Sequence, residues 1–168
     1  AVLVVATDTD AEAVARATGA GVVRDPTPDG GLNASLAAVV PPGEADLLIV
    51  ASDLPACSPE DLAAMPTAGD GVRLAPDASG LGTNALWRRP PAAIATAFGE
   101  GSAGRHRALA DSAGVAFDVV RRPGLAFDVD LPTHLKEAWD AESGCFRCQV
   151  TGVGLVVGKE NWPHPCYL

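Results

Sequence analysis

The chain is organised around residues 47–55, which read Leu47-Leu48-Ile49-Val50-Ala51-Ser52-Asp53-Leu54-Pro55. Four apolar residues in a row, without polar alternation, are typical of a parallel strand that is covered by helices on both faces. Pro55 lacks a backbone N–H and disfavours helix at the residue before it, so the chain must turn there. We therefore expect Asp53 at the carboxyl end of a central strand, where open α/β sheets bind their ligands.

Apolar runs, capping residues and glycines around this stretch predict strands that alternate with helices, which is the pattern of an α/β fold. The clearest helix start is Ser58-Pro59-Glu60-Asp61, because Ser58 can cap the helix and Asp61 can complete a capping box. We expect further strands at residues 2–5, 22–23, 72–75, 83–87, 115–120, and further helices after a cap at Thr9 or Asp10 and at residues 32–39, 91–97, 102–113 and 132–139.

The length, net charge and apolar runs of the chain argue against several classes of protein. The 168 residues are enough for one domain with a substantial core. A formal net charge of -9 argues against a protein that coats nucleic acid. No run approaches the roughly 18 apolar residues of a membrane span, and the start of the chain lacks the sections of a signal peptide, so we expect a cytoplasmic protein.

Carboxylates follow two of the expected strands. Asp53 ends the central strand, and Asp128-Val129-Asp130 follows another short apolar run. Alternate residues of an extended chain point the same way, so Asp128 and Asp130 would lie side by side and repel each other unless a cation lies between them. Hard oxygen ligands favour Mg²⁺ or Mn²⁺. The alternative is that these residues only cap helices or close turns, and Asp130 could do both.

Three glycine-bearing segments are candidate binding loops. Gly30-Gly31-Leu32-Asn33 is either a plain turn or a close backbone approach to a nucleotide, with Asn33 offering a donor and an acceptor. Gly80 to Asn84 ends in two polar side chains that could bind anionic oxygens. Gly99-Glu100-Gly101-Ser102 opens a helix, whose first amides can receive an anion, and Arg105, His106 and Arg107 follow, either as anion contacts or as a solvated basic face.

Five motifs occur together in an order that identifies a family. They are Gly30-Gly31-Leu32-Asn33, Asp53-Leu54-Pro55, Gly82-Thr83-Asn84-Ala85-Leu86, Phe98-Gly99-Glu100-Gly101-Ser102 with His106, and Asp128-Val129-Asp130-Leu131-Pro132. Over residues 1–139 the chain resembles the 2-phospho-L-lactate guanylyltransferases, some of which use phosphoenolpyruvate instead.

The resemblance implies a three-layer nucleotidyltransferase fold of the glycosyltransferase-A type, Rossmann-like, with a mainly parallel sheet and helices on both faces. It implies the joining of GMP from GTP to 2-phospho-L-lactate or phosphoenolpyruvate, with release of pyrophosphate, in the synthesis of coenzyme F(420). By this likeness Asp53, Asp128 and Asp130 would hold Mg²⁺. Thr83, Asn84, Gly99, Ser102 and Arg105 would bind the three-carbon acid, and Gly31 and Asn33 would lie near the guanosine.

The likeness leaves the acid, the oligomeric state and two rival functions open. One rival is a nucleotidyltransferase of the same fold that acts on a sugar phosphate or on molybdopterin. The other is a nucleotide-binding domain without catalysis. No general base is expected, because the acid's phosphate is already a nucleophile near neutral pH; His106 is interpreted as an anion contact or a helix-packing residue.

The two ends of the chain depart from the family pattern. Relatives begin with a further strand, a basic loop for the triphosphate and a helix before the position of Val2, so we expect a truncated product or a substitute segment. We expect a domain at residues 1–140 and an atypical tail at 141–168. A zinc site at Cys145, Cys148, His164 and Cys166 is disfavoured by the single residue between the last two. The apolar segment 149–157 could be a strand that docks into the gap left by the missing one.

Overall fold

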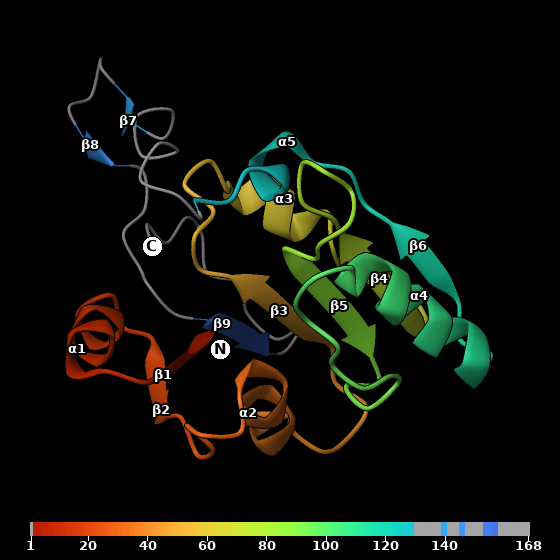
Figure 1. Ribbon diagram of the computed structural model, residues 1–168, viewed down its shortest axis with the longest axis horizontal. Helices are drawn as coiled ribbons and strands as arrows, with labels where there is room; N and C mark the ends of the chain where they lie inside the picture. Colours follow the sequence, from red (N-terminus) through yellow and green to blue (C-terminus); the bar gives the residue numbers. More distant parts are fainter. Residues whose placement is uncertain (1, 130–138, 141–144, 147–152, 158–168) are drawn as a thin grey trace.

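The computed structural model describes residues 2–129, 139–140, 145–146 and 153–157, and its centre is a seven-stranded sheet in the order β2-β1-β9-β3-β5-β4-β6 (Figure 1). The strands are β1 (Val2–Ala6), β2 (Gly21–Arg24), β3 (Leu47–Ala51), β4 (Gly71–Ala75), β5 (Ala85–Arg89), β6 (Phe117–Val119) and β9 (Val153–Val157). β1 pairs with β2 and β4 with β6 in parallel, whereas β9 and β5 are antiparallel to both of their neighbours. Five strands therefore run one way, as expected for a mainly parallel sheet.

Helices cover both faces of this sheet. They are α1 (Thr9–Ala17), α2 (Leu32–Val39), α3 (Pro59–Ala63), α4 (Ser102–Ala113) and α5 (Pro123–Ala126). α2 packs on Leu47 and Ile49 of β3, and α4 packs on the neighbouring Leu86 and Leu74. The opposite face of β3, with Leu48 and Val50, carries α3 and α5. The three-layer α/β architecture expected from the sequence is confirmed.

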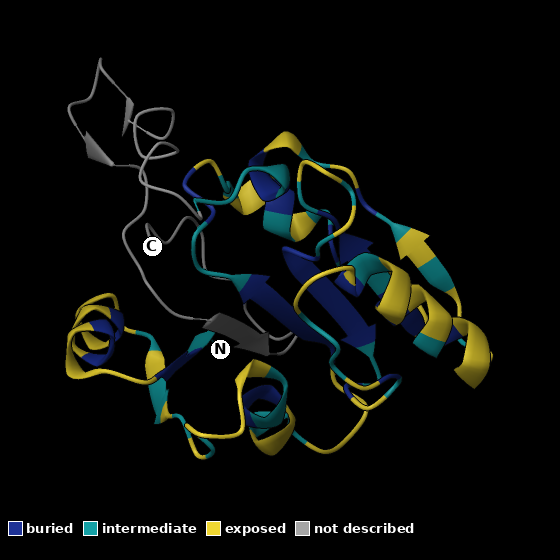
Figure 2. Cartoon of the chain, in the orientation of Figure 1, coloured by how far each residue is buried: buried dark blue, intermediate teal, exposed yellow. Residues whose placement is uncertain are grey.

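β3 is buried on both faces. Leu47, Leu48 and Ile49 expose 0%, 2% and 0% of their surface (Figure 2). Side chains alternate along a strand, so Leu47 and Ile49 serve one helix layer and Leu48 the other. Each fully buried aliphatic side chain stabilises the fold by about 1.5–3 kcal/mol. The apolar run is therefore the buried central strand that the sequence predicted, and Asp53 follows just beyond its end. The expected parallel pairing is wrong, because both neighbours of β3, which are β9 and β5, pair with it antiparallel.

The strand at the end of the chain lies inside the sheet. β9 pairs antiparallel with β1, where Leu155 is opposite Leu3, and antiparallel with β3, where Leu155 is opposite Ile49. For residues 153–157 the prediction of an inner strand is confirmed, whereas residues 149–152 of the expected segment lie outside the described residues. β9 joins residues from the expected tail to the sheet of the domain. β7 (Trp139–Asp140) and β8 (Cys145–Phe146) form a separate antiparallel pair.

The helix expected at residues 91–97 is wrong. Residues 91–94 form turns and 95–98 are irregular, because side chains rather than helical carbonyls bind this backbone. His106 Nε2 accepts from the Ala97 N–H at 2.9 Å, and Arg88 Nη1 donates to the Ile94 carbonyl. The short α5 was not expected, and Asp128 therefore follows a helix rather than the strand expected before it.

Two helix ends also differ from the sequence-based expectation. Asp8, rather than Thr9 or Asp10, caps α1, with its carboxylate accepting from the amides of Asp10 and Ala11. Trp139, the expected end of the last helix, lies in β7 instead, and residues 130–138 are outside the described ranges. Within the described ranges, no helix combines the length and the apolar character needed to cross a membrane.

Candidate active site

The strand directions bring the candidate residues to one edge of the sheet. β3 and β4 end at this edge, and β5, being antiparallel to both, begins there. The backbone of Asn84 ties the three strands together: its carbonyl accepts from the Ala51 N–H at 2.8 Å and its N–H donates to the Ala75 carbonyl at 2.9 Å. Asp53 after β3, Asp77 after β4 and Thr83 before β5 therefore gather at the same place.

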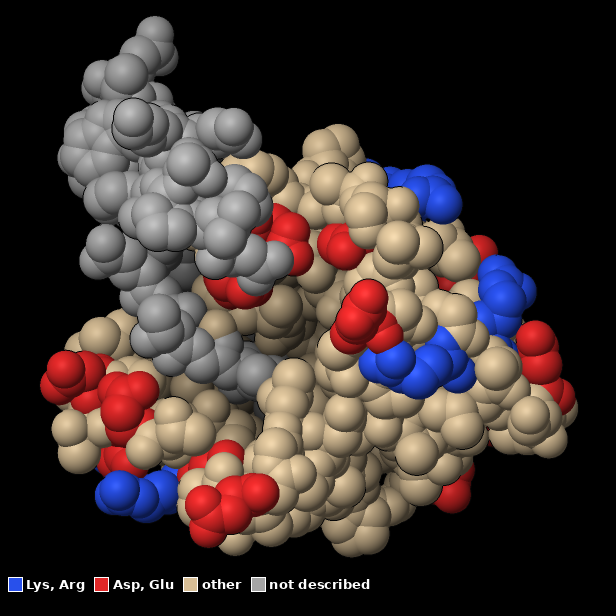
Figure 3. Space-filling view, viewed as in Figure 1, with Lys and Arg blue, Asp and Glu red and all other residues tan. Residues whose placement is uncertain are grey.

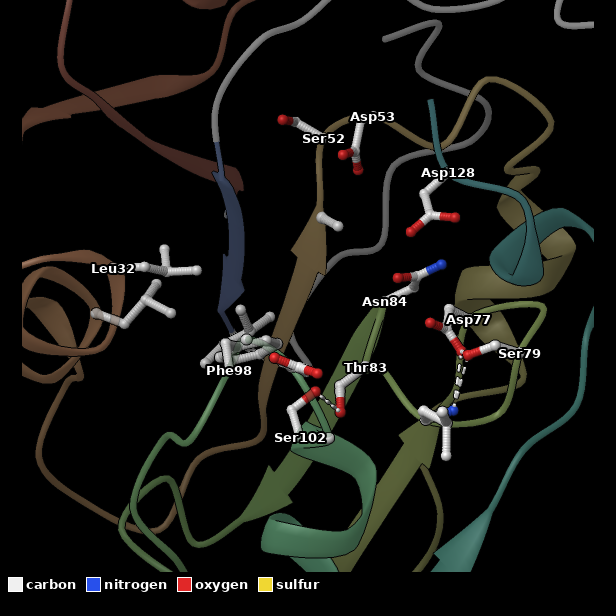
Figure 4. Close-up of a pocket in the computed structure, with 18 residues that line it drawn as sticks. Leu32, Ser52, Asp53, Asp77, Ser79, Thr83, Asn84, Phe98, Ser102 and Asp128 are labelled. Atoms are coloured by element: carbon white, nitrogen blue, oxygen red, sulfur yellow. Dashed lines mark hydrogen bonds between the residues drawn. The ribbon is translucent and has the colours of Figure 1, made fainter. Parts of the chain in front are cut away.

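A cavity of about 510 Å³ opens at this edge (Figure 4). Its lining combines loops after β3 and β4 with α2, the start of β5 and the start of α4: Leu32, Leu36, Ile49, Ala51, Ser52, Asp53, Asp77, Ser79, Leu81, Gly82, Thr83, Asn84, Phe98, Gly99, Glu100, Gly101, Ser102 and Asp128. Four of these are acidic and, among the residues that the structure describes, none of the lining is Lys, Arg or His. Acidic side chains also gather around a hollow on this face of the molecule (Figure 3).

Two of the three predicted metal ligands face this cavity. The Val129 N–H donates to the Asp53 carbonyl at 3.0 Å, which holds the segment of Asp128 beside the end of β3. Asp53 and Asp128 both line the cavity, and Figure 4 shows their carboxylates on the same side of it. Asp130 lies outside the described residues. Across the described ranges, no cluster of three Asp, Glu, His or Cys residues suited to a metal is present.

Thr83 and Ser102 line the opposite part of the cavity and form a hydrogen-bonded chain with His106 behind them. The Ser102 hydroxyl donates to Thr83 Oγ1 at 2.9 Å, and His106 Nδ1 lies 3.1 Å from the same oxygen. All three residues are buried, His106 completely. The first two amides of α4 are already used, because Ser102 N–H donates to the Gly99 carbonyl and Ala103 N–H to the Leu81 carbonyl. The Ser102 hydroxyl also donates, to Thr83, so the Thr83 hydroxyl is the donor that these contacts leave available here.

His106 is neutral at physiological pH. Burial lowers its pKa to about 4, and the nearby charges of Arg88 and Arg105 add to this effect, while a hydrogen bond with the Ser102 backbone opposes it. The edge of its ring packs against Phe98, with ring centroids 5.1 Å apart. The residue is therefore a helix-packing residue, as one of the two sequence interpretations held, and it reaches the cavity only through Thr83.

Side chains from two helices hold the 97–101 loop. Asn33 of α2 binds the Phe98 backbone twice, donating from Nδ2 to the carbonyl at 3.0 Å and accepting at Oδ1 from the N–H at 2.8 Å. Arg105 of α4 donates to the carbonyls of Ala97, at 3.0 and 3.1 Å, of Phe98, at 3.2 Å, and of Glu100. Gly99 has φ +110°, which L side chains rarely adopt. The loop is thus tied in place by polar side chains.

The loop after β4 contains a site residue that the sequence reasoning did not select. Asp77 lines the cavity, and its carboxylate accepts from the Ser79 hydroxyl at 2.8 Å and from the Leu81 N–H at 3.0 Å. Burial raises the pKa of Asp77, but hydrogen bonds from Ser79, Gly82, Leu81 and Gly80 outweigh it, so the pKa lies below its usual value. Asp77 follows a buried strand and a proline, which is a signal of the kind that selected Asp53.

The structure separates the predicted site residues into three groups. Those that line the cavity are Asp53, Thr83, Asn84, Gly99, Ser102 and Asp128. Those that do not are Gly31, Asn33 and Arg105, of which the last two act on the 97–101 loop. The Asn84 amide nitrogen also donates to the Leu125 carbonyl at 3.0 Å. Asp130, Cys148, His164 and Cys166 lie outside the described residues, and Cys145 lies in β8.

Comparison with known proteins is consistent with this geometry. Residues 1–115 match the MobA-like NTP transferase domain family. The chain is 40% identical over 165 residues to phosphoenolpyruvate guanylyltransferase of Streptomyces coelicolor, a match that covers 94% of this chain and 76% of the relative. It is 41% identical over 142 residues to the protein of that name from Rubrobacter xylanophilus, covering 80% and 68%.

A further relative bears the same name. Over 97 residues the chain is 46% identical to phosphoenolpyruvate guanylyltransferase of Sphaerobacter thermophilus, covering 56% of this chain and 47% of that protein, so the chain spans about half the length of this relative. The fold, the cavity at the carboxyl edge of the sheet and these matches all indicate the same family. The chain belongs to the MobA-like NTP transferase family and, within it, to the phosphoenolpyruvate guanylyltransferases.

Proposed function

We propose that this protein transfers GMP from GTP to the phosphate of phosphoenolpyruvate and releases pyrophosphate. The observation that carries the proposal is one cavity in which Asp53 and Asp128 face a shared space with the hydroxyls of Thr83 and Ser102 (Figure 4). The names of the relatives given above support phosphoenolpyruvate as the acceptor and a guanylyl group as the part transferred, with GTP as the proposed donor. 2-Phospho-L-lactate is the alternative acceptor.

Charge balance argues for a divalent cation. Both substrates are polyanions, yet the described lining of the cavity has Asp53, Asp77, Glu100 and Asp128 and no basic side chain. Mg²⁺ is commonly held in proteins by one or two carboxylates together with substrate phosphates and water. Asp53 and Asp128 fit that donor set, and we propose Asp130 as a third ligand. When bound, Mg²⁺ (or Mn²⁺) would neutralise and position the phosphates.

The remaining lining divides between the two substrates. Thr83, Ser102 and Gly99 would receive the carboxylate and phosphate of the three-carbon acid. Leu32 and Leu36 make the cavity wall apolar on the α2 side, which suits a nucleoside better than a phosphate. Gly31 lies directly before Leu32 in the chain, so Gly31 would also lie near the guanosine. Asn33 and Arg105 would act on the acid subsite indirectly, through the 97–101 loop.

The chemistry needs positioning rather than a strong base. An oxygen of the acid's phosphate forms a bond to the α-phosphorus of GTP, and the bond from that phosphorus to the bridging oxygen breaks as pyrophosphate leaves. The attacking phosphate carries negative charge near neutral pH, so no side chain has to remove a proton from it. Catalysis of this kind comes mainly from alignment and charge stabilisation.

The test is to measure pyrophosphate release by the purified protein with GTP, Mg²⁺ and either phosphoenolpyruvate or 2-phospho-L-lactate. We expect release that depends on both substrates, and the preferred acid identifies the acceptor. Release with a sugar phosphate or molybdopterin in place of the acid would favour the rival transferase. Binding of GTP without turnover of any acceptor would contradict the proposal and favour a nucleotide-binding domain without catalysis.

A further inference from the structure

We propose that His106 is a positioning residue that makes the Thr83 hydroxyl a dedicated hydrogen-bond donor to an anionic oxygen in the cavity. The contacts that carry this are the 3.1 Å separation between His106 Nδ1 and Thr83 Oγ1, the 2.9 Å bond from Ser102, and the 2.9 Å bond from the Ala97 N–H to His106 Nε2. The inference uses the proposed function only to name the ligand, as an acid with carboxylate or phosphate oxygens.

The contacts determine which ring nitrogen carries the proton. The Ala97 N–H can only donate, so the Nε2 that it meets must be the acceptor and carries no proton. A neutral imidazole has one N–H, which must then be on Nδ1, and this assignment follows from the hydrogen-bond network. Nδ1 therefore donates to Thr83 Oγ1, and it shares this hydrogen with the backbone of Ser102, with which the ring also forms a hydrogen bond. A protonated ring would set an Nε2–H against the Ala97 N–H.

The direction of the Thr83 hydroxyl follows from its two partners. Oγ1 has two lone pairs and one hydrogen. It accepts from Ser102 and from His106, so both lone pairs are used. Its own hydrogen cannot point back at either partner, and Thr83 lines the cavity. The hydroxyl is therefore set to donate, and its best ligand is an oxygen that only accepts, such as a carboxylate or phosphate oxygen.

The surroundings keep the ring in this state. Arg88 of β5 and Arg105 of α4 are the charged groups whose fields act on His106, and both disfavour a second positive charge there. Phe98 meets the ring edge-on, and Ser102 lies one turn before it on α4. The imidazole is wholly buried. It is therefore not placed to exchange protons with a ligand, which distinguishes positioning from general-base catalysis.

The first test needs no substrate. Long-range ¹H–¹⁵N NMR of the imidazole nitrogens, with the His106 signals assigned by their loss in His106→Asn, reports both tautomer and protonation. We expect a neutral ring with the proton on Nδ1 from pH 8 down to about pH 5. A proton on Nε2, or a charged ring at pH 6, would overturn the proposal.

The second test separates the two contacts of the ring. In His106→Asn the amide nitrogen occupies roughly the place of Nδ1 and can still donate to Thr83, whereas in His106→Gln the amide oxygen replaces Nε2 and keeps only the Ala97 contact. We expect His106→Gln to raise KM for phosphoenolpyruvate about tenfold with KM for GTP unchanged, and His106→Asn to stay within about threefold of wild type. If His106→Asn raised KM for phosphoenolpyruvate more than His106→Gln did, the role of His106 would be purely structural, through the 97–101 loop, and the inference would be refuted.

A Thr83→Val background completes the design. If His106 acts through Thr83, then adding His106→Gln to Thr83→Val changes KM for the acid no further. An additive effect would contradict the inference. Should wild-type protein fail to use phosphoenolpyruvate or 2-phospho-L-lactate, the proposed function fails, and the NMR result still decides the tautomer and hence the donor character of Thr83.

Discussion

Asp53 has its position because the strand before it is almost inaccessible to water. Leu47, Leu48 and Ile49 are buried, and the backbone turns at Leu54-Pro55, so the carboxylate follows the end of β3 and faces the cavity. Its backbone carbonyl accepts from the Val129 N–H. That bond does not involve the carboxylate, so the charge of Asp53 can be removed without breaking it.

Asp53→Asn is therefore expected to lower the rate of pyrophosphate release by on the order of 100-fold or more, because a cation ligand loses its charge. The free energy of unfolding should stay within about 1 kcal/mol of wild type, since the two side chains have nearly the same volume. Steady-state kinetics and urea unfolding measure the two effects, with Asp70→Asn, at an exposed turn, as the matched control. Full activity of Asp53→Asn with Mg²⁺ would reduce Asp53 to a capping residue.

At the scale of the element, the 97–101 loop depends on α2 and α4. Asn33 supplies a donor and an acceptor to the Phe98 backbone, at 3.0 and 2.8 Å. We expect Asn33→Ala to lower the free energy of unfolding by about 1–3 kcal/mol, because two backbone groups lose their partners. It should raise KM for the acid more than KM for GTP. Ala37→Ser, exposed on the same helix, is the control, and a change confined to KM for GTP would instead indicate direct contact with the nucleotide.

β9 links the two parts of the sheet, because it lies between β1 and β3. Its backbone pairs with β1 on one side and β3 on the other. Amide hydrogen exchange should therefore be slow in Val153–Val157, since inner strands open only in larger unfolding events. Leu155→Pro should destabilise the protein by about 3 kcal/mol or more, because proline cannot donate to a ladder. Fast exchange throughout the strand would contradict its inner position.

At the scale of the whole molecule, His106 couples stability to pH. Its pKa falls from the usual 6.5 to about 4 in the folded protein. Between these values the unfolded chain binds more protons, so the free energy of unfolding falls as pH falls from 6.5 to 4. Above pH 6.5 His106 does not change the free energy of unfolding with pH, and below pH 4 His106 causes no further loss of it. The full loss is on the order of 3 kcal/mol.

Urea unfolding of wild type and His106→Gln at pH 7 and pH 4.5 checks this coupling. We expect the wild type to lose more stability than the variant over that interval, because glutamine does not titrate. Asp61 and Asp77 have lowered pKa values, so their contributions are lost mainly below this range and are shared by both proteins. Equal losses in the two proteins would show that His106 titrates normally.

Much of the fold could be predicted because it rests on local patterns. The apolar run of β3, the capping box of Ser58 and Asp61 and the carboxylate at a strand end each depend on a few neighbouring residues. Asp53, which the last of these patterns selected, lines the cavity, and so does Thr83, which was selected from a glycine-bearing segment and from the family resemblance. The helix expected at 91–97 failed because partners distant in sequence, such as Asn33 and His106, bind the neighbouring backbone at 97 and 98.

By itself, then, the sequence determined the α/β alternation, the buried central strand and the polar residues that follow or precede strands at one edge. Only the tertiary structure decided that the neighbours of β9 are β1 and β3, that Asn33 and Arg105 act on a loop, and that His106 Nδ1 lies 3.1 Å from Thr83 Oγ1. The physical reason is the distance along the chain over which each kind of interaction acts. Periodicity and capping act within a turn or a strand, whereas the roles of these polar side chains depend on which backbone groups packing leaves in need of a partner.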